Sequence, residues 1–142
     1  YALPRSHVEG YPLDMSFSGL KKAVLNTIHN AQQKGEALDL HDLAASFAAA
    51  VSDTLIPRTM EANAQTGYNK IAVAGGVAAN SRIRAGLEQA CAQAGARLWL
   101  PPLSLCGDNA AMIGSQGYYE YLAGRTAGWE LNARANLDIS RG

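Results

Sequence analysis

The stretch IAVAGGVAANSRIR, residues 71–84, decides the fold of this chain. It begins as an apolar strand, continues into the glycine pair Gly75 and Gly76, and opens directly onto a helix. Where a strand passes into a helix in this way, free backbone N–H groups and the positive end of the helix dipole point at one spot. Such a spot suits a phosphate group or the polar edge of a nucleotide.

A second stretch, PPLSLCGDNAAMIG at 101–114, repeats this arrangement around Asp108. Strands that alternate with helices predict an α/β fold with a mainly parallel sheet flanked by helices. Ligands of such folds bind beyond the carboxyl ends of the strands, where both loops lie. Periodicity and stop signals predict a strand end at 15–18, helices at 19–34 and 38–66 (kinked or split at Pro57), a strand at 70–74, a helix at 78–94, a strand at 97–100 and a helix at 109–122.

Composition excludes several classes of protein. The 142 residues hold 12 basic and 12 acidic side chains, so no net field draws the chain to nucleic acid or to an anionic membrane. No apolar run approaches the roughly 18 residues of a membrane helix, and the start does not resemble a signal peptide. Cys91 and Cys106 show no disulfide spacing, which fits a reducing compartment. We therefore expect a cytoplasmic protein without membrane contact.

The two ends of the chain differ from its middle. Residues 1–14 contain two prolines and one glycine and begin with Tyr1 rather than Met. We expect a loop or linker inside a longer protein, the alternative being the loss of a disordered start. Residues 15–124 are predicted to form the folded lobe, and residues 125–142 a tail that packs on it.

Four positions in the two loops have both a structural and a ligand-binding explanation. Gly75 and Gly76 can end a strand and allow tight packing, or let a ligand approach the backbone. Asn80 can cap the following helix, or give paired donor and acceptor contacts to a ribose or base. Asp108 fits a helix N-cap better than a lone metal ligand, although a carboxylate at a pocket mouth also ligates cations. The local pattern leaves these alternatives open.

Other chemistry-bearing side chains have simpler explanations. His7 and Glu9 lack a second histidine and a helix that would present paired metal ligands. Cys106 is expected to pack in the core rather than bind a metal. The segment SFSGLKKA at 16–23 joins small hydroxyls, a glycine and basic residues at a helix start, which solvent exposure alone explains less easily. Basic side chains that can contact phosphates or simply face solvent are Lys21, Lys22, Arg82 and Arg84.

Three motifs, LDMSFSGLKKA (13–23), VAGGVAANSRIR (73–84) and LPPLSLCGDNAAMIGSQGYY (100–119), follow one another in this order. Together they resemble the carboxyl-terminal half of the bacterial tRNA N6-adenosine threonylcarbamoyltransferase family, formerly called O-sialoglycoprotein endopeptidase or glycoprotease. The resemblance covers nearly all of the chain. It implies an actin-like/sugar-kinase (ribonuclease H-like) ATPase fold of two lobes, of which only the second lobe is present.

The resemblance also implies an activity and the residues that serve it. Family members transfer threonylcarbamoyl from its adenylate to N6 of adenosine 37 in tRNAs that read codons starting with A. Gly75, Gly76 and Asn80 match the family residues that hold the adenylate or an ATP-type nucleotide. Asp108 matches the aspartate that ligates the active-site divalent metal, iron or zinc, which would polarise or orient the transferred group. No residue of this chain is identified as a general base.

The family takes its two metal-binding histidines from the first, N-terminal lobe, which is missing from this chain. We therefore expect that the chain alone neither transfers the group nor binds a metal tightly, because one carboxylate holds a cation weakly. The tRNA and the partner subunits of the bacterial complex would act with the whole enzyme. An apolar face left open by the missing lobe could drive formation of a homodimer.

Two other functions compete with this interpretation. A metal-dependent glycoprotease, as the older family name implies, would need a metal-bound water and a base, yet the sequence has no HExxH set. A non-catalytic lobe that binds a nucleotide or partner subunits is the second alternative for the chain by itself.

Overall fold

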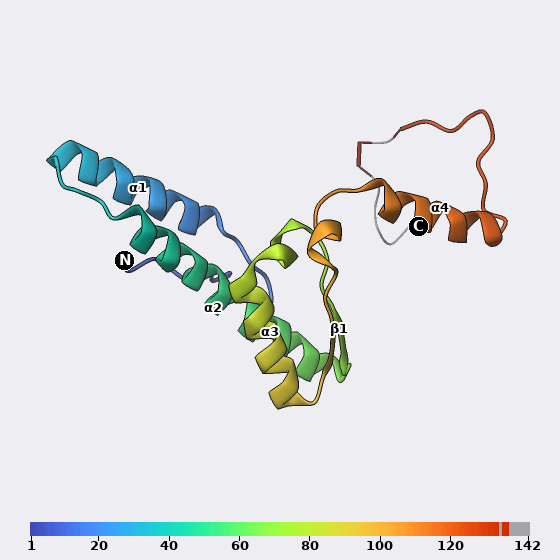
Figure 1. The fold of residues 1–142 in the computed structure, drawn as a ribbon, viewed down its shortest axis with the longest axis horizontal. Helices are drawn as coiled ribbons and strands as arrows, with labels where there is room; N and C mark the ends of the chain where they lie inside the picture. The colour runs from blue at the N-terminus through green and yellow to red at the C-terminus, as the bar shows by residue number, and fades with distance from the viewer. Residues whose placement is uncertain (134, 137–142) are drawn as a thin grey trace. The chain divides into compact units, whose positions relative to one another are not determined.

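The chain divides into two units, residues 1–107 and residues 108–142. The structure, a computed structural model, describes residues 1–133, 135 and 136. The first unit contains helices α1, α2 and α3 and strands β1 and β2, and the second unit contains helix α4 (Figure 1). The Gly75–Asn80 loop lies within the first unit, whose architecture positions it.

Two short strands form a parallel pair, and the helix between them makes this pairing possible. Strand β1 (Lys70–Ala72) pairs with β2 (Arg97–Trp99), and the Val73 N–H donates to the Trp99 carbonyl at 3.0 Å. Parallel strands need a crossover connection, which α3 (Ser81–Ala94) supplies. The predicted α/β fold with a parallel sheet is confirmed at this level.

Side chains alternate in burial along both strands. Ile71 lies opposite Leu98, and both are half-buried, whereas the strand residues beside them are exposed. On the exposed side, the guanidinium of Arg97 lies 4.6 Å from the ring centre of Trp99. Helix α3 packs against β2, and α2 packs against α3. Alternation of this kind is typical of a sheet with one covered face.

Helices α1 (Ser18–Lys34) and α2 (Leu40–Thr66) lie side by side and run in opposite directions (Figure 1). Gly35 ends α1 with a φ of 66°, which a residue without a Cβ adopts at little cost. The Asp39 carboxylate caps α2 by accepting two backbone N–H bonds of its first turn. The buried core of the pair consists of Leu3, Leu20, Leu43 and Ala50, with Phe17, Ala23, Val24, Ile28, Leu38 and Val51 packed around them.

Helix α2 continues through Pro57, so of the kink or split that the sequence predicts there, the split does not occur. Proline removes one backbone hydrogen bond and crowds the preceding turn. The two residues beside Pro57 make contacts outside the helix. Ile56 packs so closely on α3 that a Cβ added at Gly86 would lie 2.3 Å from Ile56 Cδ1. Arg58 donates to the Ser6 carbonyl at 2.5 Å.

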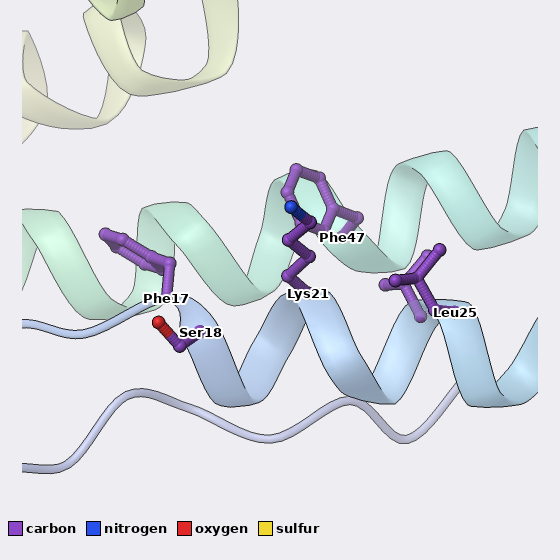
Figure 2. A pocket seen from close by; sticks show the side chains of 6 residues that line it. Phe17, Ser18, Lys21, Leu25 and Phe47 are labelled. Carbon is purple, nitrogen blue, oxygen red and sulfur yellow. The ribbon is translucent and has the colours of Figure 1, made fainter.

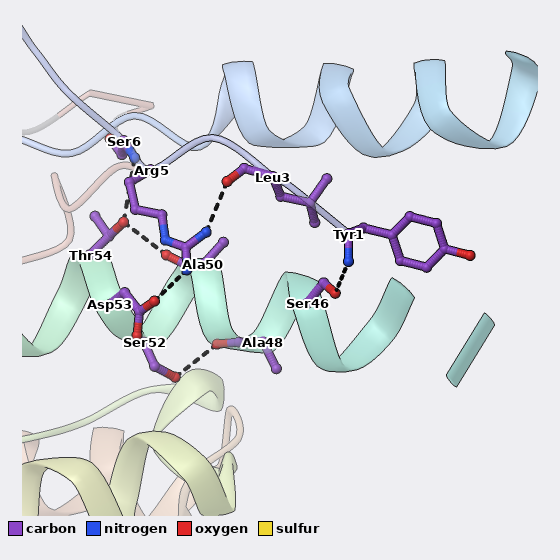
Figure 3. Close-up of polar contacts among 10 residues, drawn as sticks. All are labelled: Tyr1, Leu3, Arg5, Ser6, Ser46, Ala48, Ala50, Ser52, Asp53 and Thr54. Atoms are coloured by element: carbon purple, nitrogen blue, oxygen red, sulfur yellow. Dashed lines mark hydrogen bonds and ion pairs between the residues drawn. The ribbon is translucent and has the colours of Figure 1, made fainter. Parts of the chain in front are cut away.

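The segment before α1 is bound along α2 by its own backbone and side chains. Leu3 is only 6% exposed and belongs to the core. The Ser6 N–H donates to Thr54 Oγ1 at 3.4 Å, while its carbonyl accepts from Arg58. Figure 3 shows two further contacts to α2, from the Tyr1 amino group to Ser46 and from Arg5 to Asp53. These residues therefore form part of the fold, whatever precedes them.

Some boundaries differ from the predicted ones. Residues 15–17 form no strand, because Ser18 already begins α1 and the segment pairs with neither strand of the sheet. A 3₁₀ helix, Gly76–Ala79, precedes α3, so that helix begins three residues later than predicted. A second 3₁₀ helix, Leu103–Leu105, follows β2.

Helix α4 (Ala110–Leu122) is the main element of the second unit. Beyond it, the Arg125 guanidinium pairs with Glu120 and, by this hydrogen bond, holds the pKa of that carboxyl below its usual value. Residues 134 and 137–142 lie outside the described residues, so the predicted packing of the 125–142 tail stays a prediction. No helix of the described residues has the length and apolar character needed to cross a membrane.

The burial of Leu3 gives the first testable expectation. We expect Leu3→Ala to lower the free energy of unfolding by about 2–5 kcal/mol, because it leaves a cavity beside Leu20 and Leu43. Chemical denaturation followed by circular dichroism measures this. Leu40→Ala is the control, since Leu40 is 65% exposed and its truncation should cost well under half as much. Equal losses in the two variants would contradict the assignment of residues 1–6 to the fold.

Candidate functional site

The loop after β1 has a backbone that only glycine adopts readily. Gly75 has a φ of 88° and a ψ of 171°, a region essentially closed to residues with a Cβ. Its carbonyl accepts from the Ala78 N–H at 3.0 Å, which starts the 3₁₀ turn. Gly76 has no such φ, and a Cβ built there would meet no atom within 4 Å. The two glycines therefore differ: Gly75 shapes the loop, and Gly76 leaves its surface open.

Asn80 caps α3, so one of its two sequence explanations is confirmed. Its Oδ1 accepts from the N–H groups of Arg82 at 3.0 Å and Ile83 at 3.1 Å. A carbonyl oxygen has two lone pairs, and both are engaged here. The side-chain amide can therefore offer a ligand only its two N–H donors, and not the paired donor and acceptor that the sequence allowed.

The capping also changes what the start of α3 can offer an anion. The sequence led us to expect free backbone N–H groups there. Two of them, from Arg82 and Ile83, are instead bonded to Asn80. What remains for a ligand is the dipole of the helix, the amide donors of Asn80 and the exposed backbone of the glycine pair.

A cavity of about 800 Å³ borders this loop. Its walls are mostly apolar and include Phe47, Val51 and Leu55 of α2 and Gly76, Ala79 and Asn80 of the loop. This size falls within the range of small-molecule sites, in which a few polar groups orient a mostly apolar ligand surface. Asn80 is a polar residue of this cavity, at its rim on the loop side.

A second hollow of about 500 Å³ opens beside the first one and shares Phe17 and Phe47 with it. Figure 2 shows Lys21 over this hollow, near Phe47, with Ser18 at the start of α1. Phe17 precedes α1 and provides no side-chain cap, and the first turn has no acidic residue. The helix dipole and the absence of an acidic residue in the first turn therefore make the amino-terminal end of α1 positive.

Asp108 belongs to the second unit and does not cap α4. The cap is the next residue, Asn109, whose Oδ1 accepts from the Met112 N–H at 3.1 Å. The explanation of Asp108 as the N-cap is therefore wrong. Asp108 is exposed, and its carboxylate makes no hydrogen bond or ion pair with any other described residue. The carboxylate is therefore available to a ligand.

The described residues do not assemble a metal site by themselves. No group of three or more His, Cys, Asp or Glu side chains comes together in that part of the chain. His7 and Glu9 are exposed loop residues. Cys106 is 2% exposed, which confirms the expected packing role. Cys91 is equally buried, and its burial raises the pKa of the thiol. A single carboxylate does not fit a metal that needs several ligands in fixed geometry.

The sequence of this chain matches known proteins over a range that includes both loops. Residues 1–115 match the sequence profile of a family described as tRNA N6-adenosine threonylcarbamoyltransferase. A protein of that name from Clostridium botulinum (strain Kyoto / Type A2) is 46% identical over 136 residues, which are 96% of this chain and 40% of the relative. The protein of that name from Desulfitobacterium hafniense (strain Y51) is 45% identical over 99% of this chain and 41% of its own length. The one from Halalkalibacterium halodurans is also 45% identical, over 96% of this chain and 40% of its own length. The chain thus spans about two fifths of these relatives.

The capping role of Asn80 gives the second testable expectation. We expect Asn80→Ala to lower the free energy of unfolding by about 1 kcal/mol, because two N–H groups of α3 lose their acceptor. Asn80→Asp keeps the acceptor oxygen and should change stability by only a few tenths of a kcal/mol. Denaturant titration of the three proteins measures the difference. If Ala and Asp destabilise equally, capping is not what Asn80 contributes to the fold.

Proposed function

The chain belongs to the tRNA N6-adenosine threonylcarbamoyltransferase family, and on that premise we propose that it is the carboxyl-terminal part of an enzyme that transfers threonylcarbamoyl from its adenylate to N6 of an adenosine in tRNA. The observation that carries this proposal is the Gly75–Asn80 loop, where amide donors border an apolar cavity of about 800 Å³. Family membership supports the proposed chemistry, and the loop is the proposed place of the adenylate.

The adenylate is proposed to lie across this loop. Its phosphate oxygens accept from the Asn80 amide, since that side chain can offer only donors. The open surface at Gly76 lets the phosphate approach the backbone closely. The adenine ring, whose faces are apolar, enters the cavity between the loop and α2, beside Val51 and Leu55.

The proposed reaction joins the amine nitrogen of adenosine to the carbamoyl carbon and breaks the bond from that carbon to a phosphate oxygen. The proton that the amine nitrogen loses passes to water. AMP leaves and gains negative charge as the bond breaks. Donors already aimed at the phosphate stabilise that charge without reorganising during the reaction, and this is the role that we propose for Asn80. Catalysis by this chain therefore consists of positioning and electrostatic stabilisation.

Asp108 is proposed to be one ligand of the divalent metal, iron or zinc, in the whole enzyme. The remaining ligands must come from outside the described residues, because these contain no further set. We also propose that the chain is the second lobe of an actin-like/sugar-kinase fold. The amino-terminal lobe, the tRNA and the partner subunits of the bacterial complex would meet it in the cytoplasm.

The division of the site between lobes gives the third testable expectation. The full-length protein, supplied with threonylcarbamoyl-adenylate and an unmodified tRNA transcript, should form modified adenosine, which nucleoside mass spectrometry detects. The 142-residue chain alone should form none. Asp108→Asn in the full-length protein should lower the rate by at least about 100-fold, because a metal ligand is lost.

Glu9→Gln is the matched control for that experiment, since it also neutralises an exposed carboxylate in a loop. It should retain the rate of the unsubstituted protein. Transfer by the isolated chain, or full activity of Asp108→Asn, would contradict the proposed division of the site.

The adenylate pocket gives the fourth testable expectation, measured by calorimetric titration of AMP into the full-length protein. Ala79→Trp fills the cavity and should weaken AMP binding about tenfold or more. Asn80→Asp preserves the cap but replaces the amide donors with a negative charge, so AMP binding should weaken by a similar factor. Leu40→Trp adds the same ring to α2 away from this cavity and should leave the affinity unchanged. Equal weakening by Leu40→Trp, or unchanged affinity in Ala79→Trp, would place the nucleotide elsewhere.

A further inference from the structure

Arg84 reaches from α3 to the two loops that follow the strands. Its terminal nitrogen Nη1 donates to the Ala78 carbonyl at 2.8 Å and to the Pro101 carbonyl at 3.1 Å. The same nitrogen lies 4.0 Å from Cys106 Sγ, which in turn donates to the Pro102 carbonyl at 3.5 Å. The side chain is half-buried among these groups.

The two carbonyls belong to different loops at the same edge of the sheet. Ala78 lies in the 3₁₀ helix between Gly75 and Asn80, and it is 1% exposed. Pro101 begins the loop that follows β2. The parallel ladder ends just before both, at the bond from the Val73 N–H to the Trp99 carbonyl. Arg84 therefore bridges the loops beyond the last rung of the sheet.

A charged donor suits this position. Hydrogen bonds from an ionised group are roughly twice as strong as neutral ones, and partial burial reduces competition from water. Arg82, on the same helix, is exposed, and its side chain makes no hydrogen bond to either loop. The two arginines, which the sequence treats alike, thus have different surroundings.

We propose that Arg84 is a positioning residue of the adenylate site: it fixes the Gly75–Asn80 loop against the Pro101–Cys106 loop, and so sets the place of Asn80. This inference rests on the proposed function. Arg84 itself touches no reacting atom, because its donor nitrogen is directed at the two loop carbonyls. Its effect on the reaction passes through the loops.

The experiment compares three variants of the full-length protein. Arg84→Met removes the donors and keeps a long apolar stem, Arg84→Lys keeps the charge on a shorter side chain, and Arg82→Met is the matched control. Hydrogen–deuterium exchange reports on residues 75–80 and 101–106, calorimetry on AMP affinity, and steady-state kinetics on KM for the adenylate and on kcat.

Arg84→Met is expected to speed amide exchange in both loops about tenfold and to raise the Kd for AMP and the KM for the adenylate by a similar factor. Exchange in α1 and in the first half of α2 should stay unchanged, which separates loop positioning from a general loss of stability. Arg84→Lys should give intermediate values, and Arg82→Met should match the unsubstituted protein.

Unchanged exchange in both loops of Arg84→Met would overturn the inference, as would equal effects of Arg82→Met and Arg84→Met on KM. Should Arg84→Met not fold, the same two comparisons with Arg84→Lys decide the matter. If the unsubstituted protein neither binds AMP nor transfers threonylcarbamoyl, the proposed function fails. Loop exchange still tests the bridge in that case, so the two failures are distinguishable.

Discussion

The parallel pairing of β1 and β2 is the constraint on which the rest of the first unit depends. Two parallel strands cannot be joined by a tight turn, so the chain must cross back over the sheet, and α3 makes that crossing. The crossing places the ends of both strands at one edge. A loop that must turn sharply from strand to helix then appears at this edge, with Gly75 in a conformation that other residues rarely adopt and Asn80 completing the start of α3. The candidate site follows from the connection between the strands, and it would not exist in an antiparallel hairpin.

The features that could be predicted from the sequence are those that depend on near neighbours in the chain. Helix periodicity and glycine stops located α1 and α2 within about two residues, and the strand–helix–strand order predicted the parallel sheet. Features that depend on distant residues were missed. Helix α2 passes Pro57 unbroken at a point where Ile56 packs on Gly86 and Arg58 binds Ser6, and neither contact leaves a local signal. Leu3 was assigned to a linker because prolines and a glycine surround it, although its side chain completes the core of the α1–α2 pair.

The candidate site shows the same limit. The sequence singled out Gly75, Gly76, Asn80 and Asp108, and the structure explains the first and third of these by backbone geometry and capping. The sequence alone could not assign the cap of α4, because aspartate and asparagine are both good caps. Only the backbone at the helix start decides between Asp108 and Asn109. Nor could the sequence separate Arg82 from Arg84. The contacts of Arg84 reach 6 residues back and 17 residues forward, and only the folded crossover brings those carbonyls together.

Asn80 connects the stability of the fold with the chemistry of the site. Its carbonyl oxygen accepts from two N–H groups of the helix, and its amide nitrogen is the group that we propose binds the adenylate phosphate. Serine, threonine and aspartate would cap α3 as well, yet none of them offers two donors beside an acceptor that is already engaged. If capping alone determined this position, any of these residues would suffice. In the proposed site, two donors hold a phosphate oxygen at the start of the helix, and asparagine provides them without weakening the crossover that holds the two strands parallel.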